Sequence, residues 1–437
     1  MDWVTTLFVM LGVVCLQLFV GVPVAFAFLA ANILGALLFL GGLDALVTFP
    51  IEALDAIGKF SLTPIPMFVL MGELLFHTGV AIRAIDAIDK LIVRVPGRLA
   101  VVSLLGGTAF ASLSGSTIAS TALIGNTLLP RMISQGYDKK LAMGSIMSVG
   151  GIAMLIPPSA LAVLLASLAE QSIAGLLIAG IVPGLLMALL FVAYVLIRCR
   201  INPGLAPQEA QIETRRVEWR PIVVYVLPLF VIFAAVLGSM FGGFASPTES
   251  AAVGCVVTAV VCAGYRKLTL SSIRVSIIET AKISVMILFI VAGSLTFSQI
   301  LAVSGGTSGL LRTLAEAAFS PMNIVLIMLV ILLFLGCFMD QISMILLTLP
   351  FFVPLALSND IDMIWLMLLV LVTMELSLLT PPFGLLLFVM KGVAPKDITL
   401  TNVYGAAMPF VLMKYVVLIL LIAWPQVATW LPNLVLR

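Results

Sequence analysis

The chain carries very little charge. Only 10% of its 437 residues are Asp, Glu, Lys or Arg, whereas 62% are hydrophobic. A soluble domain has roughly 25% charged residues, so a water-exposed surface of ordinary extent is excluded. The net charge of +2 gives no electrostatic basis for binding nucleic acid. These absences predict an integral membrane protein surrounded by a lipid bilayer.

Side chains for metal or catalytic chemistry are also scarce. The only histidine is His77, and the five cysteines lie far apart without the spacing of metal ligands. We expect no transition-metal site, no cofactor and no disulfide. The sequence contains no HExxH pair, no nucleotide-binding loop and no nucleophile motif with a usable histidine, so we expect that the protein is not an enzyme.

Apolar stretches long enough to cross a bilayer are frequent. About 20 apolar residues are needed, and the clear candidates are 4–20, 22–41, 173–197, 221–241, 245–265 and 402–424. The first stretch follows Asp2 rather than a positive charge, which indicates a retained span instead of a signal peptide. The polar linker 201–220 separates two halves, 1–200 and 221–437.

The two halves resemble each other. Six pairs of identical residues are each 224 positions apart: Pro23 and Pro247, Phe110 and Phe334, Pro130 and Pro354, Asp138 and Asp362, Pro157 and Pro381, Pro158 and Pro382. Each half contains two spans, a segment with a polar break, an amphipathic stretch, two broken spans and a final span. Five crossings per half would invert the second half, as in many secondary transporters. We predict an all-α inverted-repeat membrane protein of about 10–12 spans.

The segment with a polar break is expected to be a re-entrant helical hairpin in each half. Segment 44–79 is interrupted around Ser61 and Thr63, and segment 271–304 near Ser284. The two tips are predicted to face each other and, with helix N-termini, to bind an anionic substrate. The same substrate site is predicted to include Pro157, Pro158, Pro381 and Pro382.

Breaks inside the later spans predict cation sites. Non-helical backbone at membrane depth must be buried or line a polar cavity, and a carboxylate there defaults to a functional role. One cation is expected between Ser114–Ser116 and Gly150–Ala153. A second is expected between the equivalent segments of the other half, Gly336–Asp340 and Met374–Thr380. Oxygen ligands suit Na⁺. The assigned residues are Ser114, Gly115, Ser116, Thr117, Gly150, Gly151, Ala153, Gly336, Asp340, Met374 and Thr380.

Each of these features has a simpler alternative explanation. The Ser114–Thr117 break, interpreted as a span that unwinds midway, could be a small-residue packing surface. Each proline pair could be a kink. Lys59 and Lys282 are interpreted as snorkelling to the interface. His77 is interpreted as a hairpin-exit residue, and Glu73 and Glu249 as local caps or partners.

Several motifs together resemble a known family. GGFASPTESAAVG at 242–254 is similar to a signature of the large permeases of TRAP transporters, differing at Ser246 and Ser250, where Thr and Ala are more usual. Five further motifs follow in the family's order along the chain: IPMFVLMGELL, SGSTIAS, GGIAMLIPPS, CFMDQIS and LLTPPFGLLLFV.

The resemblance implies an elevator-type transporter in a bacterial inner membrane, crossing it several times. It implies Na⁺ as the coupling ion and a small organic acid as substrate, mostly C4-dicarboxylates, sugar acids or sialic acids. It also implies two partners, a small four-helix membrane subunit and a periplasmic substrate-binding protein. The alternative is a stand-alone ion-coupled carboxylate transporter of related fold.

Overall fold

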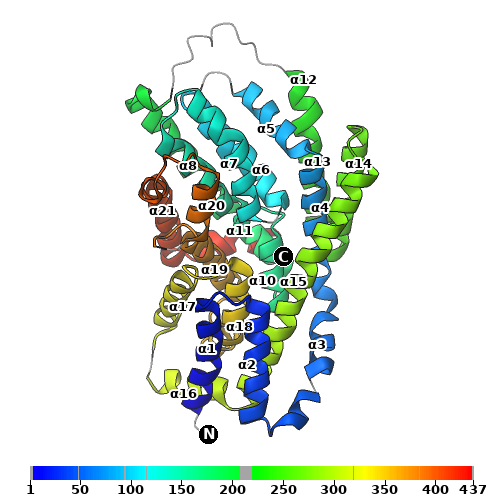
Figure 1. Cartoon of the computed structure of the whole chain (residues 1–437), viewed down its shortest axis with the longest axis vertical. Coiled ribbons are helices and arrows are strands. Elements are labelled where there is room, and N and C mark those ends of the chain that lie inside the picture. The colour runs from blue at the N-terminus through cyan, green and yellow to red at the C-terminus, as the bar shows by residue number, and fades with distance from the viewer. Residues whose placement is uncertain are drawn as a thin grey trace.

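The computed structural model describes residues 3–47, 49–92, 95–114, 116–206, 219–317, 319–382 and 384–435. Regular structure within these ranges is helical, and Figure 1 shows the helices as an elongated bundle. Seven described helices are long and apolar enough to cross a membrane, or eight if a bent pair counts as one span. The predicted all-α membrane architecture is confirmed. Gly115 and residues 207–218 of the linker lie outside the described residues.

The first half contains eleven described α-helices. They are α1 (Trp3–Phe19), α2 (Val24–Phe39), α3 (Phe49–Ile57), α4 (Pro64–His77), α5 (Val80–Leu91), α6 (Arg98–Ser114), α7 (Thr117–Ser134), α8 (Lys139–Met147), α9 (Val149–Leu155), α10 (Ala160–Leu168) and α11 (Ile173–Ile201). Short 3₁₀ turns are η1 (Leu43–Val47), η2 (Phe60–Leu62) and η3 (Pro203–Leu205).

The second half has a similar order, with the short helix α12 before it and the additional helix α22 after it. Its elements are α12 (Trp219–Pro221), the π-turn η5 (Ile222–Val226), α13 (Leu227–Phe241), α14 (Pro247–Gly264), α15 (Leu270–Val303), α16 (Gly306–Glu316), α17 (Pro321–Leu335), α18 (Gln341–Ser358), α19 (Met363–Ser377), α20 (Leu385–Val393), α21 (Leu400–Ala423) and α22 (Gln426–Val435).

The aspartate shared by the two halves, Asp138 and Asp362, has the same structural role in both. Asp138 accepts a hydrogen bond from the Leu141 amide at 2.9 Å and begins α8, and Asp362 accepts one from Trp365 at 2.8 Å and begins α19. An aspartate at this position satisfies a free backbone donor of the first turn. The Asp138–Asp362 pair therefore marks two equivalent helix starts.

Corresponding elements of the halves lie at opposite ends of the molecule. The pair α1–α2 and the short helix α16 are at the lower end in Figure 1, whereas α13–α14 and α5 are at the upper end. The halves also interlock, because α4 packs on α14 and α15, and α2 packs on α15. Such contacts between helices of opposite halves are expected of an inverted duplication.

The hairpins predicted at 44–79 and 271–304 are wrong. Helix α15 runs without a break through Lys282 and Ser284 for 34 residues. Ser284 does not stop a helix that lacks Pro or Gly nearby, and Lys282 pairs with Glu279 one turn earlier at 2.7 Å. In the first half, α3 and α4 are separated around Gly58 and Pro64, but both pack along α15, so they lie in line (Figure 1).

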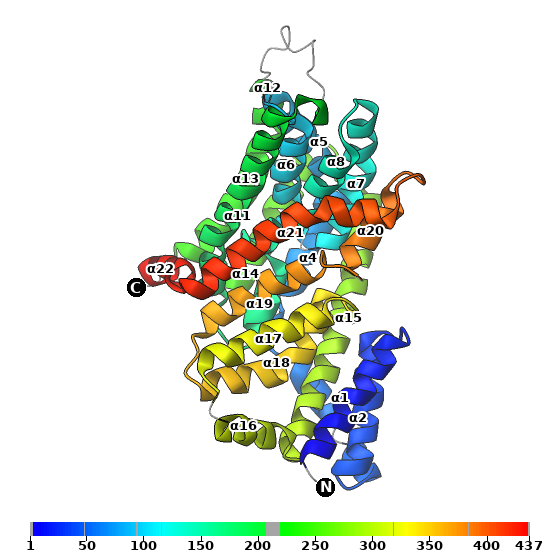
Figure 2. The same cartoon turned by 90° about the vertical axis from the view of Figure 1, so that its left-hand side faces the viewer.

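The hairpins form instead where the sequence predicted spans that unwind midway. Helices α6 and α7 pack against each other, and a Cβ placed on Gly107 would lie 2.8 Å from Ile124 Cδ1, so α6 and α7 form a helical hairpin. Helices α17 and α18 pack side by side in the second half (Figure 2). The prediction placed the breaks correctly but missed the reversal, because apolar arms of 15 to 18 residues look alike in either arrangement.

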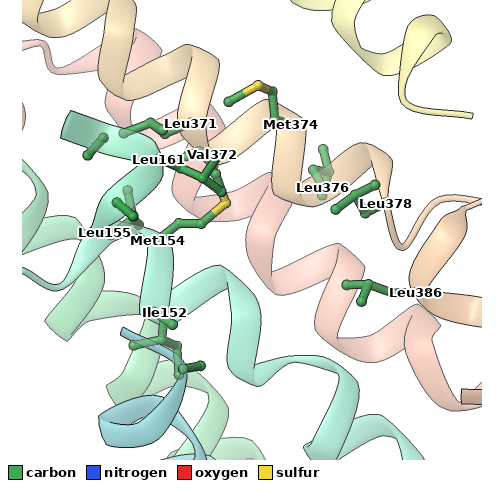
Figure 3. Packing of buried hydrophobic residues seen from close by; sticks show 14 of the residues in the cluster. Ile152, Met154, Leu155, Leu161, Leu371, Val372, Met374, Leu376, Leu378 and Leu386 are labelled. Atoms are coloured by element: carbon green, nitrogen blue, oxygen red, sulfur yellow. The ribbon is translucent and has the colours of Figure 1, made fainter. Parts of the chain in front are cut away.

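The broken span predicted at 139–168 is confirmed. Helices α8 and α9 together meet α10 at a bend of 43° around Pro157 and Pro158. In the second half, α19 ends at Ser377 and α20 begins at Leu385, on either side of Pro381 and Pro382. Figure 3 shows the apolar side chains of α9 and α10, such as Met154 and Leu161, beside those of α19, such as Leu371 and Val372. The two breaks therefore share one buried core.

Candidate substrate and ion site

The returning arm of each hairpin begins with a capped helix. Ser116 accepts a hydrogen bond from the Ala119 amide at 3.2 Å and caps α7. Asp340 caps α18 by accepting from the Ile342 amide at 3.1 Å and from the Ser343 hydroxyl. Ser116 and Asp340 are 224 positions apart, so the two caps are equivalent. Each start adds the partial positive charge of a helix N-terminus.

Both capped starts open onto one cavity of about 550 Å³. One wall is formed by α4 and α15, and the other by the starts of α7, α10 and α18. The wall is mainly apolar, and its polar members are Glu73, His77, Ser116, Glu279, Asp340 and Gln341. The size and the few convergent polar groups are typical of a small-molecule site.

The polar groups on the α4–α15 wall are partly paired. His77 Nε2 lies 3.1 Å from Glu73 Oε2, one turn apart on α4. Glu279 Oε1 lies 2.7 Å from Lys282 Nζ on α15. Sequence reasoning assigned Glu73 and His77 only local roles, and it did not consider Glu279. Val69, Glu73 and His77 are spaced four residues apart, and so are Glu279 and Ile283. This helical spacing is the sequence signal that could have identified the face that lines the cavity.

A buried polar network lies between the hairpin tips. Glu375 on α19 is 1% exposed and Lys414 on α21 is fully buried, with Nζ 3.3 Å from Glu375 Oε1. The other carboxylate oxygen, Oε2, accepts from Gln341 Nε2 at 2.9 Å and from Thr117 Oγ1 at 3.4 Å. Gln341 and Thr117 are the first residues of α18 and α7. Sequence reasoning matched Glu375 to Gly151 but did not assign it to the site, and it missed Lys414.

The structure brings together the breaks that the sequence paired. A Cβ on Gly150 would lie 1.9 Å from Thr117 Cγ2, and a Cβ on Gly151 would lie 2.7 Å from Lys414 Nζ. A Cβ on Gly336 would lie 1.8 Å from Ser377 Oγ, so the second hairpin tip touches the end of α19. The first tip therefore contacts Gly150 in helix α9, so the turn predicted at Gly150–Ala153 is helical in the structure, and the second tip contacts the end of α19 within Met374–Thr380.

The remaining cation candidates lie in or beside these segments. Ala153 and Met374 are 4% and 0% exposed, and the Thr380 hydroxyl donates to the Leu376 carbonyl at 2.8 Å. Ser114 ends α6 at the first tip, next to Gly115 outside the described residues. Whether these groups bind Na⁺ stays a prediction.

The predicted substrate residues are not among the described residues that line this cavity. Among the described residues, the wall includes Ser116 and Asp340 but not Ser61, Thr63, Ser284, Pro157, Pro158, Pro381 or Pro382. The Ser61 carbonyl accepts from the Ser167 hydroxyl at 2.7 Å, near the end of α10. Ser61 and Ser284 were assigned as hairpin tips, so the shift of the hairpins to α6–α7 and α17–α18 also moves the expected site.

Glu249 acts as the sequence suggested. Its carboxylate accepts from the Ser246 amide at 2.7 Å while Ser246 Oγ accepts from the Glu249 amide at 3.3 Å, which completes a capping box at the start of α14. Lys59 forms a 2.8 Å ion pair with Glu170, so its interpretation as a purely snorkelling side chain is incomplete.

The fold and sequence match known transporters. The solved structure of the Alcanivorax borkumensis YdaH transporter aligns with a TM-score of 0.61 at 13% identity, covering 91% of each chain, and so shows a shared fold. A Pseudomonas aeruginosa C4-dicarboxylate TRAP transporter large permease protein, DctM, is 32% identical over 89% of this chain and 90% of its own length. A Ruegeria pomeroyi ectoine/5-hydroxyectoine TRAP transporter large permease protein, UehC, is 30% identical over 95% of this chain and 96% of its own length.

The family model described as the tripartite ATP-independent periplasmic transporter, DctM component, matches residues 11–427. This match covers nearly the whole chain, and the bacterial relatives and apolar helices agree with a multi-pass protein of the inner membrane. The chain therefore belongs to the DctM family, the large permease components of tripartite ATP-independent periplasmic transporters.

Proposed function

We propose that this chain carries a small organic carboxylate across the inner membrane, driven by Na⁺, after receiving it from a periplasmic binding protein. A small four-helix membrane subunit would complete the transporter. The observation that supports this most is the cavity between α4–α15 and the capped starts of the two hairpin arms, α7 and α18. Helix N-termini favour a carboxylate there without a basic side chain.

The charges of the cavity narrow the choice of carboxylate. Its wall holds Glu73, Glu279 and Asp340. Because the Asp340 carboxylate already occupies the start of α18, a substrate carboxylate would favour the start of α7, which the neutral Ser116 caps, with its far end toward the two glutamates. A second substrate carboxylate would be repelled there, whereas a cationic or hydrogen-bond-donating group would be favoured. UehC is named for ectoine, a zwitterion, and DctM for C4-dicarboxylates. We propose a single carboxylate joined to a cationic group as the preferred substrate.

Na⁺ would bind at the hairpin tips and favour the substrate-binding arrangement. The Asp340 carboxylate is a hard oxygen donor at the second tip, and the first turn of α9, at Gly150 and Gly151, lies next to the first tip. An ion there would order both tips and so complete the cavity wall. Coupling then follows from differential affinity, because substrate binds best to the ion-loaded state.

An elevator motion would carry the hairpins and broken helices past α4 and α15. The cavity supports this proposal because its two walls belong to the two groups of helices that would move apart. The exposed Lys59–Glu170 pair, which joins the start of the α4 segment to the end of α10, would break during the movement.

Uptake into proteoliposomes tests the proposal. We expect concentrative uptake only when this chain, the small subunit, a cognate binding protein and an inward Na⁺ gradient are all present. A panel of ectoine, succinate and sialic acid tests the charge argument, and a K⁺ gradient is the matched control. Uptake by this chain alone would support a stand-alone carrier, and preferred uptake of succinate would contradict the zwitterion proposal.

A further inference from the structure

The Glu375–Lys414 pair has a feature that ordinary helix packing does not require. Burying two charges costs more than an apolar pair of similar volume unless the geometry is fully satisfied. Here both carboxylate oxygens have partners, and the three donors come from three helices, α7, α18 and α21. Glu375 thus joins the first residues of both returning hairpin arms, and Lys414 balances its charge.

The pair exists in only one half of the duplication. Thr117 and Gln341 correspond at the offset of 224, and so do Gly151 and Glu375. When Pro183 of α11 is aligned with Pro409 of α21, the counterpart of Lys414 falls within residues 187–190. These residues are Met, Ala, Leu and Leu, none of them charged. Neither charge therefore has an equivalent, although the donors around Glu375 do.

The backbone makes room for the ammonium at the point where the halves meet. A Cβ on Gly151 would lie 2.6 Å from Lys414 Cε, and a Cβ on Gly150 would lie 2.5 Å from Glu375 Oε1. The partners facing Glu375 are thus Thr117 on α7, Gly150 on α9, Gln341 on α18 and Lys414 on α21, and Lys414 is the charged member of this set.

We propose that the Lys414 ammonium is a tethered cation that takes the place of a soluble ion beside Glu375. It keeps Glu375 ionised, so the carboxylate holds both hairpin tips together whether or not the coupling ions are bound. Lys414 is therefore a positioning residue that sets how many soluble cations transport requires. This inference rests on the proposed ion-coupled transport for its uptake test.

Removal of the ammonium is the direct test. Lys414→Met leaves Glu375 uncompensated, so we expect uptake to need roughly one more soluble cation, seen as a steeper Na⁺ dependence or a new requirement for acid that protonates Glu375. The double variant Lys414→Met/Glu375→Gln is neutral and should return to the wild-type Na⁺ and pH dependence. Lys391→Met, in α20 outside the network, is the matched control.

A second measurement does not depend on transport. The unfolding temperature of purified Lys414→Met should rise with NaCl more than that of the wild type, with N-methylglucamine chloride holding ionic strength constant. If wild-type uptake fails for every substrate, this measurement still tests the tethered cation. Wild-type Na⁺ and pH dependence in Lys414→Met would overturn the inference, as would equal loss of folding in the single and double variants.

Discussion

The two halves of the molecule share their architecture but differ in the chemistry at their centre. Ser116 and Asp340 begin equivalent helices, yet one is neutral and the other is a carboxylate. Gly151 stands where the second half has Glu375, and the counterpart of Lys414 is apolar. The duplication therefore supplies the hairpins and the breaks twice, the two halves share one cavity, and the charged groups between the tips come from the second half.

The two halves also differ in the long helical arms beside the cavity. In the first half the arm is divided into α3 and α4, and in the second half it is the single helix α15. Pro64 and Pro66 lack backbone N–H donors and Gly58 weakens the helix, whereas 271–304 has no proline and its Gly293 lies within an unbroken ladder. Equivalent positions in an inverted repeat can thus keep their packing role after the local backbone has changed.

The largest expected difference between the two halves is the membrane face that equivalent residues reach. Gln135 ends α7 and Asn359 ends α18, and they are 224 positions apart. Single cysteines at these positions, in a background without the five native cysteines, should react with a membrane-impermeant thiol reagent from opposite faces of the membrane. Labelling of both from one face would contradict the inverted relation of the halves.

Gly150→Ala should cause the largest loss of stability. The added methyl group meets Thr117 and Glu375, which belong to different helices and cannot both move away. We expect about 3 kcal/mol of destabilisation, typical of severe overpacking, and loss of uptake. Thermal unfolding in detergent measures it. Gly238→Ala is the control, because a Cβ there meets nothing within 4 Å, and equal effects of the two changes would refute the packing explanation.

Substitutions of Asp340 and Ser116 separate the effect of the negative charge from the effect of helix capping. Asp340→Asn keeps a side chain able to cap α18 but removes the negative charge, so we expect the half-saturating Na⁺ concentration to rise about tenfold. Ser116→Ala removes a neutral cap of α7 and should cost about 1 kcal/mol of stability. Uptake measured against Na⁺ concentration distinguishes the two. Unchanged Na⁺ affinity in Asp340→Asn would remove this carboxylate from the proposed ion site.

The smallest effect is expected at Lys59 and Glu170. Both side chains are largely exposed, so Glu170→Gln should change the uptake rate less than about fivefold, in line with a surface ion pair worth at most ~1 kcal/mol. The hydrogen bond and the positive charge of Lys59 lower the pKa of Glu170. The pair should therefore persist below the usual pKa of a glutamate and break as the pH falls through the lowered value. A pH profile shared by wild type and Glu170→Gln would show that the pair has no effect on transport.

Sequence alone determined the membrane class, the duplication and the breaks near Ser116, near Asp340 and at the two proline pairs, but it wrongly placed a break near Ser284. Low charge and long apolar runs leave only a helical membrane protein, and prolines 224 residues apart mark equivalent backbone positions regardless of the fold between them. Ser116, Gly336 and Asp340 were found this way, because each lies where an apolar run is interrupted and hydrocarbon tolerates no free backbone.

Only the tertiary structure decided which broken segments double back and which side chains meet. Arms of similar length and apolarity fit a hairpin or a bent span equally well, so the hairpins were placed at 44–79 and 271–304 instead of α6–α7 and α17–α18. Lys414 and Glu375 are 39 residues apart on different helices, and no local pattern joins them. Their pairing follows from how α19 and α21 pack beside Gly150 and Gly151, which is a property of long-range packing.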